Sequence, residues 1–267
     1  MKIPSIFGFV VFAMLGGCSQ PTSPAPGAPS PSLRATSDVP SPAFSPKANG
    51  VVDLETPSGI PSPSATPTET PKTSTDIPVE LKHAAYRYYG LSFDQPMNME
   101  VVTTGNSGNR TGSQTTTLKK YKNGVAIYSV QRTGGLADLG SMEVRLEKSG
   151  IFVQSSPLAK IGPHDIEMPA SLEPGTKWQS NSEIDNPGQK IKIDSTFRVV
   201  RFEKVTTKKG SYDALLISST GSGMMNGDKI VMETRSWYVK DRGNVKAVIT
   251  TKSAKGKVNT VTLQETP

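Results

Sequence analysis

The sequence predicts a mainly β protein, in which an antiparallel meander forms a curved sheet or half-barrel and a disordered linker precedes it. Three observations predict this fold class. Apolar and polar residues alternate with a period of two in many segments after residue 124, as in half-buried strands. Turn-forming Asn and Gly residues separate these segments at intervals of roughly ten residues. Prolines gather outside them, since 14 of the 22 lie between Ser19 and Glu80.

The first 17 residues have the layout of an export signal. Met1-Lys2 is positively charged, and the run from Ile3 to Leu15 is apolar but shorter than the roughly 20 residues of a membrane-spanning helix. The run ends in Leu15-Gly16-Gly17-Cys18. This motif resembles the lipobox of bacterial lipoproteins, and Cys18 is the single cysteine of the chain.

The resemblance implies that Cys18 carries a thioether-linked diacylglyceride and usually an N-acyl chain. Two or more acyl chains anchor a protein stably, whereas one gives marginal binding. The membrane is therefore the first expected partner. Ser19 stands where an Asp would favour the inner membrane, so the lipid-anchored protein is expected at the outer membrane of a two-membrane cell, and otherwise on the outer face of the plasma membrane.

Residues 18–80 are predicted to be a disordered linker rich in Pro, Ser, Thr and Ala. Such a segment buries too little apolar surface to offset the entropy lost on ordering. The 62 residues after Cys18 would span roughly 190 Å as an extended polyproline helix and about 45 Å as a coil. The segment is either a tether that holds the folded part away from the membrane or a spacer of unselected length.

Residues 81–267 are predicted to form one antiparallel β domain after a short helical stretch around 79–86. Met142 to Lys148 shows the alternation well, with apolar residues on one face and charged residues on the other. Residues 157–174 are expected to form a loop with short extended pieces, and Gly221 and Gly223 are expected in a turn. The other expected strands are 125–130, 151–154, 190–202, 212–217, 230–239, 245–249 and 258–263.

The second half of this domain carries a second resemblance. Pro174-Gly175-Thr176-Lys177-Trp178, Tyr212-Asp213-Ala214 and the stretch from Trp237-Tyr238 to Gly243-Asn244-Val245-Lys246 resemble motifs of TapB-like lipoprotein domains of unknown function. The resemblance covers about residues 172–250 and implies a curved β-sheet akin to the half-barrels of lipoprotein carriers. It implies no catalytic residues.

The folded part is basic. Only four of the 30 Lys and Arg residues and six of the 23 Asp and Glu residues precede residue 81, so the domain has a net charge of +9 within the total of +7. A charge of this size serves solubility and can also attract phosphate or anionic lipid headgroups. Nucleic acid is not an expected partner of an exported protein.

The sequence predicts no enzyme, no metal site and no cofactor. His164, Asp165 and Glu167 stand close together but are interpreted as an exposed polar loop, and His83 lies far from them in the chain. No segment of the chain has the ligand spacing of a zinc or calcium site. No segment matches the phosphate-binding P-loop or places a serine nucleophile on a strand–helix turn.

Six large side chains are the candidate ligand face, although core packing explains most of them equally well. They are four aromatic residues and an adjacent pair of methionines that would form an adaptable mouth: Trp178, Tyr212, Met224, Met225, Trp237 and Tyr238. The leading hypothesis is a non-catalytic envelope lipoprotein whose β domain binds or scaffolds another envelope component. The alternative is a carrier or sensor of a lipid or other hydrophobic ligand in the concave face of the sheet.

Overall fold

The structure is a computed structural model that describes residues 77–104, 109–156, 166–186 and 189–267. The predicted signal peptide (1–17), Cys18 and nearly all of the predicted linker lie outside the described residues, as do His164 and Asp165. The described residues belong to one compact unit.

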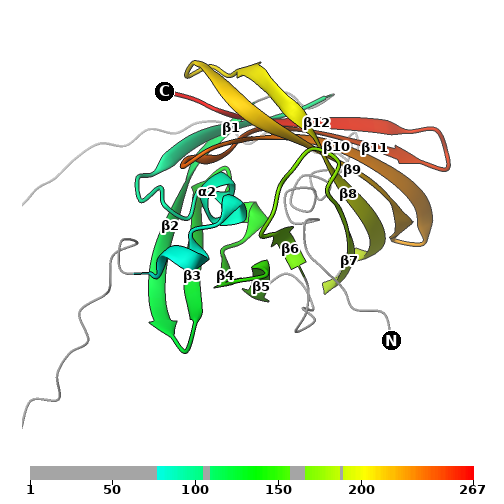
Figure 1. Cartoon of the computed structure of the whole chain (residues 1–267). Helices are drawn as coiled ribbons and strands as arrows, with labels where there is room; N and C mark the ends of the chain where they lie inside the picture. Colours follow the sequence, from blue (N-terminus) through cyan, green and yellow to red (C-terminus); the bar gives the residue numbers. More distant parts are fainter. Residues whose placement is uncertain (1–76, 105–108, 157–165, 187–188) are drawn as a thin grey trace, which may run out of the picture. The chain divides into compact units, whose positions relative to one another are not determined.

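All described strands belong to one antiparallel sheet (Figure 1). The strand order is β6-β5-β4-β3-β2-β1-β12-β11-β10-β9-β8-β7. The twelve strands are β1 (Met97–Thr103), β2 (Arg110–Lys122), β3 (Val125–Gly134), β4 (Met142–Glu147), β5 (Gly150–Ser155), β6 (Ile166–Pro169), β7 (Lys177–Asn186), β8 (Gln189–Thr206), β9 (Ser211–Met225), β10 (Asp228–Val239), β11 (Gly243–Ser253) and β12 (Val258–Glu265).

This order is an up-and-down meander that has nearly closed on itself. Every pair of strands that follow one another in the chain is hydrogen-bonded, except β6 and β7, which form the two edges of the sheet. The first and last strands, β1 and β12, pair instead in the middle, with Met99 opposite Glu265. The mainly β class and the curved antiparallel meander predicted from the sequence are therefore confirmed, as a nearly closed, barrel-like sheet.

Local sequence explains the regular part of this fold. Along β10, the even-numbered residues from Ile230 to Tyr238 are buried, whereas Val231, Glu233 and Arg235 are exposed. The tight turns use residues that tolerate a positive φ: Asn123-Gly124 has φ of 53° and 78°, and Asn226-Gly227 has φ of 50° and 86°. Asn-Gly favours this turn because its twist matches that of the flanking strands.

A short helix, α2 (Ala84–Tyr89), lies inside the curve of the sheet (Figure 1). It follows the 3-10 turn η2 (Val79–Leu81), close to the predicted helical stretch. The His83 ring caps it: Nδ1 accepts the Tyr86 backbone N–H at 3.3 Å, and Nε2 lies 2.9 Å from the Glu147 carbonyl oxygen, to which it donates. Burial lowers the His83 pKa and so favours the neutral ring, although the hydrogen bond to the Glu147 carbonyl acts in the opposite direction.

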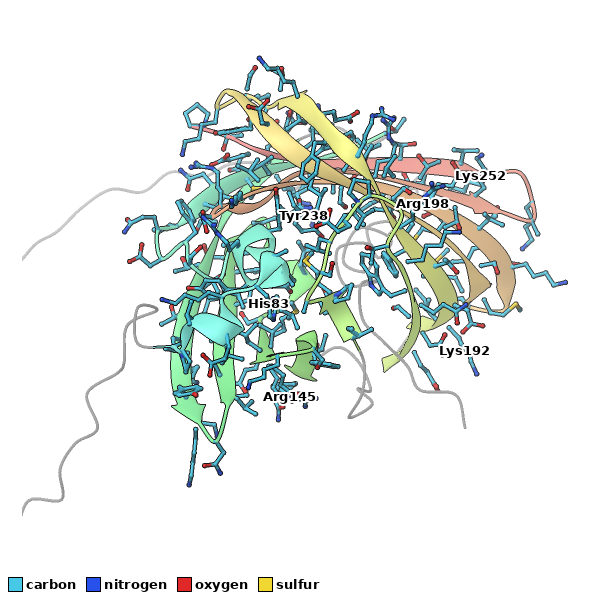
Figure 2. All side chains as sticks on the ribbon, in the orientation of Figure 1. His83, Arg145, Lys192, Arg198, Tyr238 and Lys252 are labelled. Carbon is cyan, nitrogen blue, oxygen red and sulfur yellow. The ribbon has the colours of Figure 1, made fainter. Side chains whose placement is uncertain are left out.

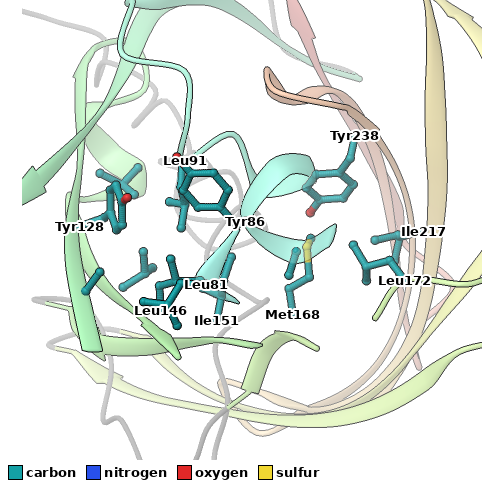
Figure 3. Close-up of a cluster of buried hydrophobic side chains, with 14 of the residues drawn as sticks. Leu81, Tyr86, Leu91, Tyr128, Leu146, Ile151, Met168, Leu172, Ile217 and Tyr238 are labelled. Atoms are coloured by element: carbon teal, nitrogen blue, oxygen red, sulfur yellow. The ribbon is translucent and has the colours of Figure 1, made fainter. Parts of the chain in front are cut away.

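The helix and the sheet enclose the main hydrophobic core (Figure 3). Tyr86 and Leu81 point from the helical segment toward Tyr128, Leu146 and other buried side chains of the sheet. Tyr128 and Leu146 are fully buried. The concave side of the sheet is thus largely filled by the protein's own side chains.

The structure corrects one local prediction and adds strands that the sequence reading did not assign. Gly221 and Gly223 were expected in a turn, but they belong to β9 and pair with Met232 and Ile230. A Cβ atom at Gly223 would overlap the carbonyl oxygen of Lys192 on β8, so the glycine allows the two strands to approach closely. Strands β1, β2 and β7 were not predicted, and the four-residue β6 lies within the segment expected to be a loop with short extended pieces.

Candidate binding surfaces

The concave side retains one small cavity beside the core. Its volume is ≈ 70 Å³, and its apolar wall includes Met97, Met99 and Leu263. A water molecule needs roughly 10–15 Å³ of such space, so the cavity is large enough for a few waters. Sites for drug-sized ligands measure roughly 300–1,000 Å³. An acyl chain therefore does not fit this cavity as it stands.

Polar side chains from several elements build the other wall of the cavity. Arg132 of β3 donates from Nε to Gln114 at 2.9 Å and from Nη1 to the carbonyl oxygen of Gly140 at 2.8 Å. Burial lowers the pKa of Arg132, while Tyr89 and Glu167 act in the opposite direction. The Tyr89 hydroxyl hydrogen-bonds to Glu167 of β6, which is 6% exposed. Tyr238 of β10 completes this wall.

The two tyrosines of the cavity are hydrogen-bond donors at neutral pH. Burial raises the pKa of Tyr89 well above its usual value, and the charge of Glu167 raises it further. The same two causes raise the pKa of Tyr238. Neither hydroxyl can serve readily as a base or nucleophile, because both roles need a lowered pKa or an adjacent base. The arrangement orients polar groups around a small space and offers it protons rather than a reactive anion.

A larger hollow lies on the opposite, outward face of β7–β10. Its volume is ≈ 560 Å³, and amide, hydroxyl and carboxylate groups line it: Gln179, Asn181, Asp194, Thr196, Thr220 and Ser222. These residues occupy two cross-strand rows. Gln179, Thr196 and Thr220 are neighbours in one row, and Asn181, Asp194 and Ser222 are neighbours in the next. The hollow therefore presents a regular array of hydrogen-bonding groups to the outside.

The ends of β8 and β9 form an arm that lies across the outward face of the sheet. We call residues 200–214 the β8–β9 arm; it begins at the register shift between Val199 and Arg201. Glu203 of the arm accepts a hydrogen bond from Trp237 Nε1 at 2.7 Å, and the Thr206 carbonyl accepts one from Lys246 at 3.1 Å. A separate hydrophobic cluster joins the arm to the sheet, with Val205 and Ala214 from the arm and Leu216, Trp237 and Val245 from the sheet.

Ion pairs fasten the tip of the arm to β1 and β12. Lys208 Nζ lies 2.7 Å from a carboxylate oxygen of Glu100, and Lys209 Nζ lies 3.4 Å from Glu265. Both carboxylate side chains are buried, with exposed fractions of 6% and 0%. Arg242, in the turn between β10 and β11, binds the same Glu265 carboxylate.

Acidification is expected to release this arm. The hydrogen bond from Lys208 lowers the pKa of Glu100, and the hydrogen bond from Trp237 lowers that of Glu203. Burial alone would raise the pKa of Glu265, but the hydrogen bonds from Arg242 and Tyr212 outweigh it and lower this pKa too. A depressed pKa adds stability that is complete above the unfolded value of about 4.3 and is lost as the pH falls through the folded value.

Hydrogen exchange of the arm amides should therefore change little from about pH 7 to pH 5, once the intrinsic exchange rate is corrected for, and protection should fall below about pH 4. Amides of β3 and β4, which lie away from the arm, provide the internal reference. Loss of protection at both places at the same pH would mean global acid unfolding and would contradict a local release of the arm.

The six predicted ligand-face residues do not share one face. Trp178 stacks on Phe197 with ring centroids 5.3 Å apart inside the main core, and Tyr238 faces the interior cavity. Met225 packs on the interior cluster of Ile191 and Ile230. The other three belong to the outward face: Tyr212 is part of the arm, Trp237 lies beneath the arm, and Met224 is 41% exposed.

Several polar residues of these surfaces were absent from the sequence prediction. Arg132 and Glu265 are the clearest, and a signal for both exists. Arg132 lies two residues after Val130 and four after Tyr128, both of which are buried, so it is on the same face of β3. Glu265 stands in the same relation to Leu263 and Val261 on β12. A charge in the apolar phase of a strand points to a buried, paired group. Glu167, considered only with His164 and Asp165, instead faces the cavity.

No described helix is long and apolar enough to cross a bilayer. Within residues 77–104, 109–156, 166–186 and 189–267, no three His, Cys, Asp or Glu side chains are grouped as a metal site would require.

Comparisons with known proteins give fold-level likenesses. No family model and no curated protein matches the chain, so the resemblance to TapB-like domains stays a prediction. One similar solved structure is a "putative lipoprotein" of Parabacteroides distasonis, with 9% identity, a TM-score of 0.44, and coverage of 67% of this chain and 97% of that chain. Another is a "putative exported protein with YmcC-like fold" of Bacteroides fragilis, with 10% identity, a TM-score of 0.35, and coverage of 64% and 95%. Neither likeness carries an argument about function.

Proposed function

We propose that this protein is a lipid-anchored, non-catalytic component of the cell envelope, whose β domain binds another envelope component through its outward face. The observation that carries the proposal is the contrast between the two faces of the sheet. Helix α2 and the main core leave a cavity of ≈ 70 Å³ on the concave side, whereas the outward hollow measures ≈ 560 Å³.

The lining of the hollow indicates the chemistry of its ligand. Thr196, Thr220 and Ser222 offer hydroxyl groups, and Asp194 offers a carboxylate. Val231 is the one large apolar residue among them. A ligand rich in hydrogen-bonding groups matches this surface, whereas an acyl chain would leave the polar groups unpaired, which is costly.

The alternative, a carrier of a hydrophobic ligand, draws support from the apolar part of the interior cavity. Met97, Met99 and Met142 line it, and methionine side chains adapt readily to a guest. A carrier would need α2 to move away from the core. Organic extraction of the purified full-length protein, followed by mass spectrometry, separates the alternatives: a carrier yields near-stoichiometric lipid in addition to its own anchor.

Site-specific crosslinking tests the proposed binding face. A photoreactive residue in place of Thr220, inside the hollow, is expected to give a discrete product in intact cells. The same residue in place of Lys120, an exposed position of β2, is the matched control. A second variant, Ser222→Trp, fills the hollow and should abolish the product from position 220. The proposal is contradicted if the crosslinked product from position 220 still forms in the Ser222→Trp variant. It is also contradicted if a crosslink forms equally well from position 120.

A further inference from the structure

Exposed apolar side chains gather at one end of the sheet. Five large hydrophobic residues are exposed in the described part of the chain, and three of them lie near the turns that join β9 to β10 and β11 to β12. These three are Met224 (41% exposed), Val231 (48%) and Val258 (56%). Together with Lys229, Lys252 and Lys255 we call them the hairpin-tip patch.

Strand register places apolar and basic residues of the patch side by side. Met224 of β9 is opposite Lys229 of β10. Val231 of β10 is opposite Lys252 of β11, which is in turn opposite Val258 of β12. These side chains point outward, because the adjacent Ile230 and Met232 are buried in the interior cluster. Figure 2 shows Lys252 at this end of the sheet, with its side chain directed away from the ribbon.

The patch carries an excess of positive charge. Residues 228–233 and 252–258 contain four lysines against two carboxylates. Lys252 pairs with Glu233 at 3.5 Å and Lys255 with Asp228 at 3.0 Å, and all four partners are largely exposed. No ion pair of Lys229 occurs within the described ranges. Exposed pairs are weak and leave the lysines accessible to a new anionic partner.

Lysines that alternate with exposed apolar side chains match the chemistry of an anionic bilayer surface. Cations bind lipid headgroups, and short apolar side chains enter the boundary between headgroups and acyl chains. A polyanion in solution would use the lysines but gain nothing from Met224, Val231 and Val258. We propose that the hairpin-tip patch docks the β domain onto a membrane surface that contains anionic phospholipid.

This inference is separate from the function proposed for the hollow, although the two surfaces adjoin at Val231. Docking through the hairpin tips would leave the opposite end of the sheet, with the β8–β9 arm and the Asn123-Gly124 turn, directed away from the lipid. A ligand bound in the hollow would then lie beside the membrane surface.

Vesicle sedimentation of the unlipidated mature chain, residues 19–267, tests the docking in the absence of the apolar signal segment. The protein should sediment with vesicles of phosphatidylcholine mixed with phosphatidylglycerol, but not with phosphatidylcholine alone. Each lysine near an anionic surface strengthens binding several-fold. Lys229→Glu with Lys252→Glu should therefore weaken the partition at least about tenfold. Val231→Ser with Val258→Ser, which keeps the charge, should weaken it several-fold.

The matched control is Lys120→Glu with Lys122→Glu, which makes the same charge change on the β2–β3 hairpin at the opposite end of the sheet. Binding should stay unchanged there, and thermal melting confirms that each variant is folded. The proposal is overturned if the control weakens binding as much as the patch variant. It is also overturned if the valine substitutions have no effect, which would mean that the lysines alone attract the protein and the apolar side chains do not enter the bilayer. The crosslinking experiment at position 220 does not depend on vesicle binding. The proposed ligand-binding hollow and the proposed membrane docking can therefore each be contradicted without the other.

Discussion

Replacing Arg242 with Met is expected to lower the free energy of unfolding by about 3–5 kcal/mol at neutral pH. The Glu265 side chain has no solvent exposure, and Arg242 Nε lies 3.1 and 3.0 Å from its two carboxylate oxygens. The guanidinium also covers the rings of Phe93 and Tyr212, at 5.0 and 5.3 Å from their centroids. Its removal leaves a buried carboxylate with Tyr212 and the more distant Lys209.

Denaturant unfolding measures this loss, and two variants define its origin. Arg242→Met with Glu265→Gln should recover much of the stability, because replacing a whole buried pair is often nearly neutral. Arg110→Met removes the exposed pair with Asp138, whose side chains are 38% and 64% accessible, and should cost less than about 1 kcal/mol. Equal losses in Arg242→Met and Arg110→Met would show that burial of Glu265 contributes nothing.

The same variant should reverse the pH dependence of Glu265. Burial tends to raise the pKa of this carboxyl, and Arg242 is the leading group that opposes it. Without the arginine, the folded pKa is expected to exceed the unfolded value of about 4.3. A raised pKa favours the folded state as the carboxyl protonates. The deficit of Arg242→Met relative to wild type should therefore shrink as the pH falls from about 7 toward 4.

Sequence periodicity predicted most of the strands that have one regular buried face and missed β2, which lacks one. β10 alternates between buried and outward residues from Ile230 to Ser236, and β11 alternates from Gly243 to Lys252. β2 does not: of its 13 residues only Leu118 is buried, and the rest are mainly Thr, Ser, Gly, Gln and Lys. Its strand conformation depends on pairing with β1 and β3 rather than on its own pattern. Such pairing with neighbouring strands is not visible in the apolar pattern of β2 itself.

The six residues of the candidate ligand face do not form a single surface, and the sequence already contains the reason. Successive residues of a strand point to opposite faces, so Trp237 and Tyr238 could not share one, and neither could Met224 and Met225. The alternation of residues along a strand does not, however, predict what each face of the sheet contacts. Trp237 lies under the β8–β9 arm because Glu203, 34 residues earlier, accepts its indole hydrogen bond.

The second large effect is expected at Cys18, which lies outside the described residues. A Cys18→Ser variant should incorporate no labelled palmitate and should move from the membrane to the soluble fraction, because serine cannot form the thioether. Each buried methylene adds about 0.8 kcal/mol to membrane binding, so two or three chains hold the protein far more firmly than a surface patch can. Substitution of Ser19 by Ala, next to the cysteine, is the matched control and should leave both label and membrane fraction unchanged.

Salt separates the anchor from the hairpin-tip patch. Acyl insertion is apolar and insensitive to ionic strength, whereas the attraction of Lys229 and Lys252 to anionic lipid is screened over about 8 Å at physiological salt. Any residual binding of Cys18→Ser should therefore disappear in a high-salt wash that leaves the wild type in place. A Cys18→Ser protein that still takes up palmitate, or that stays with membranes through such a wash, would mean that the attachment lies elsewhere in the chain.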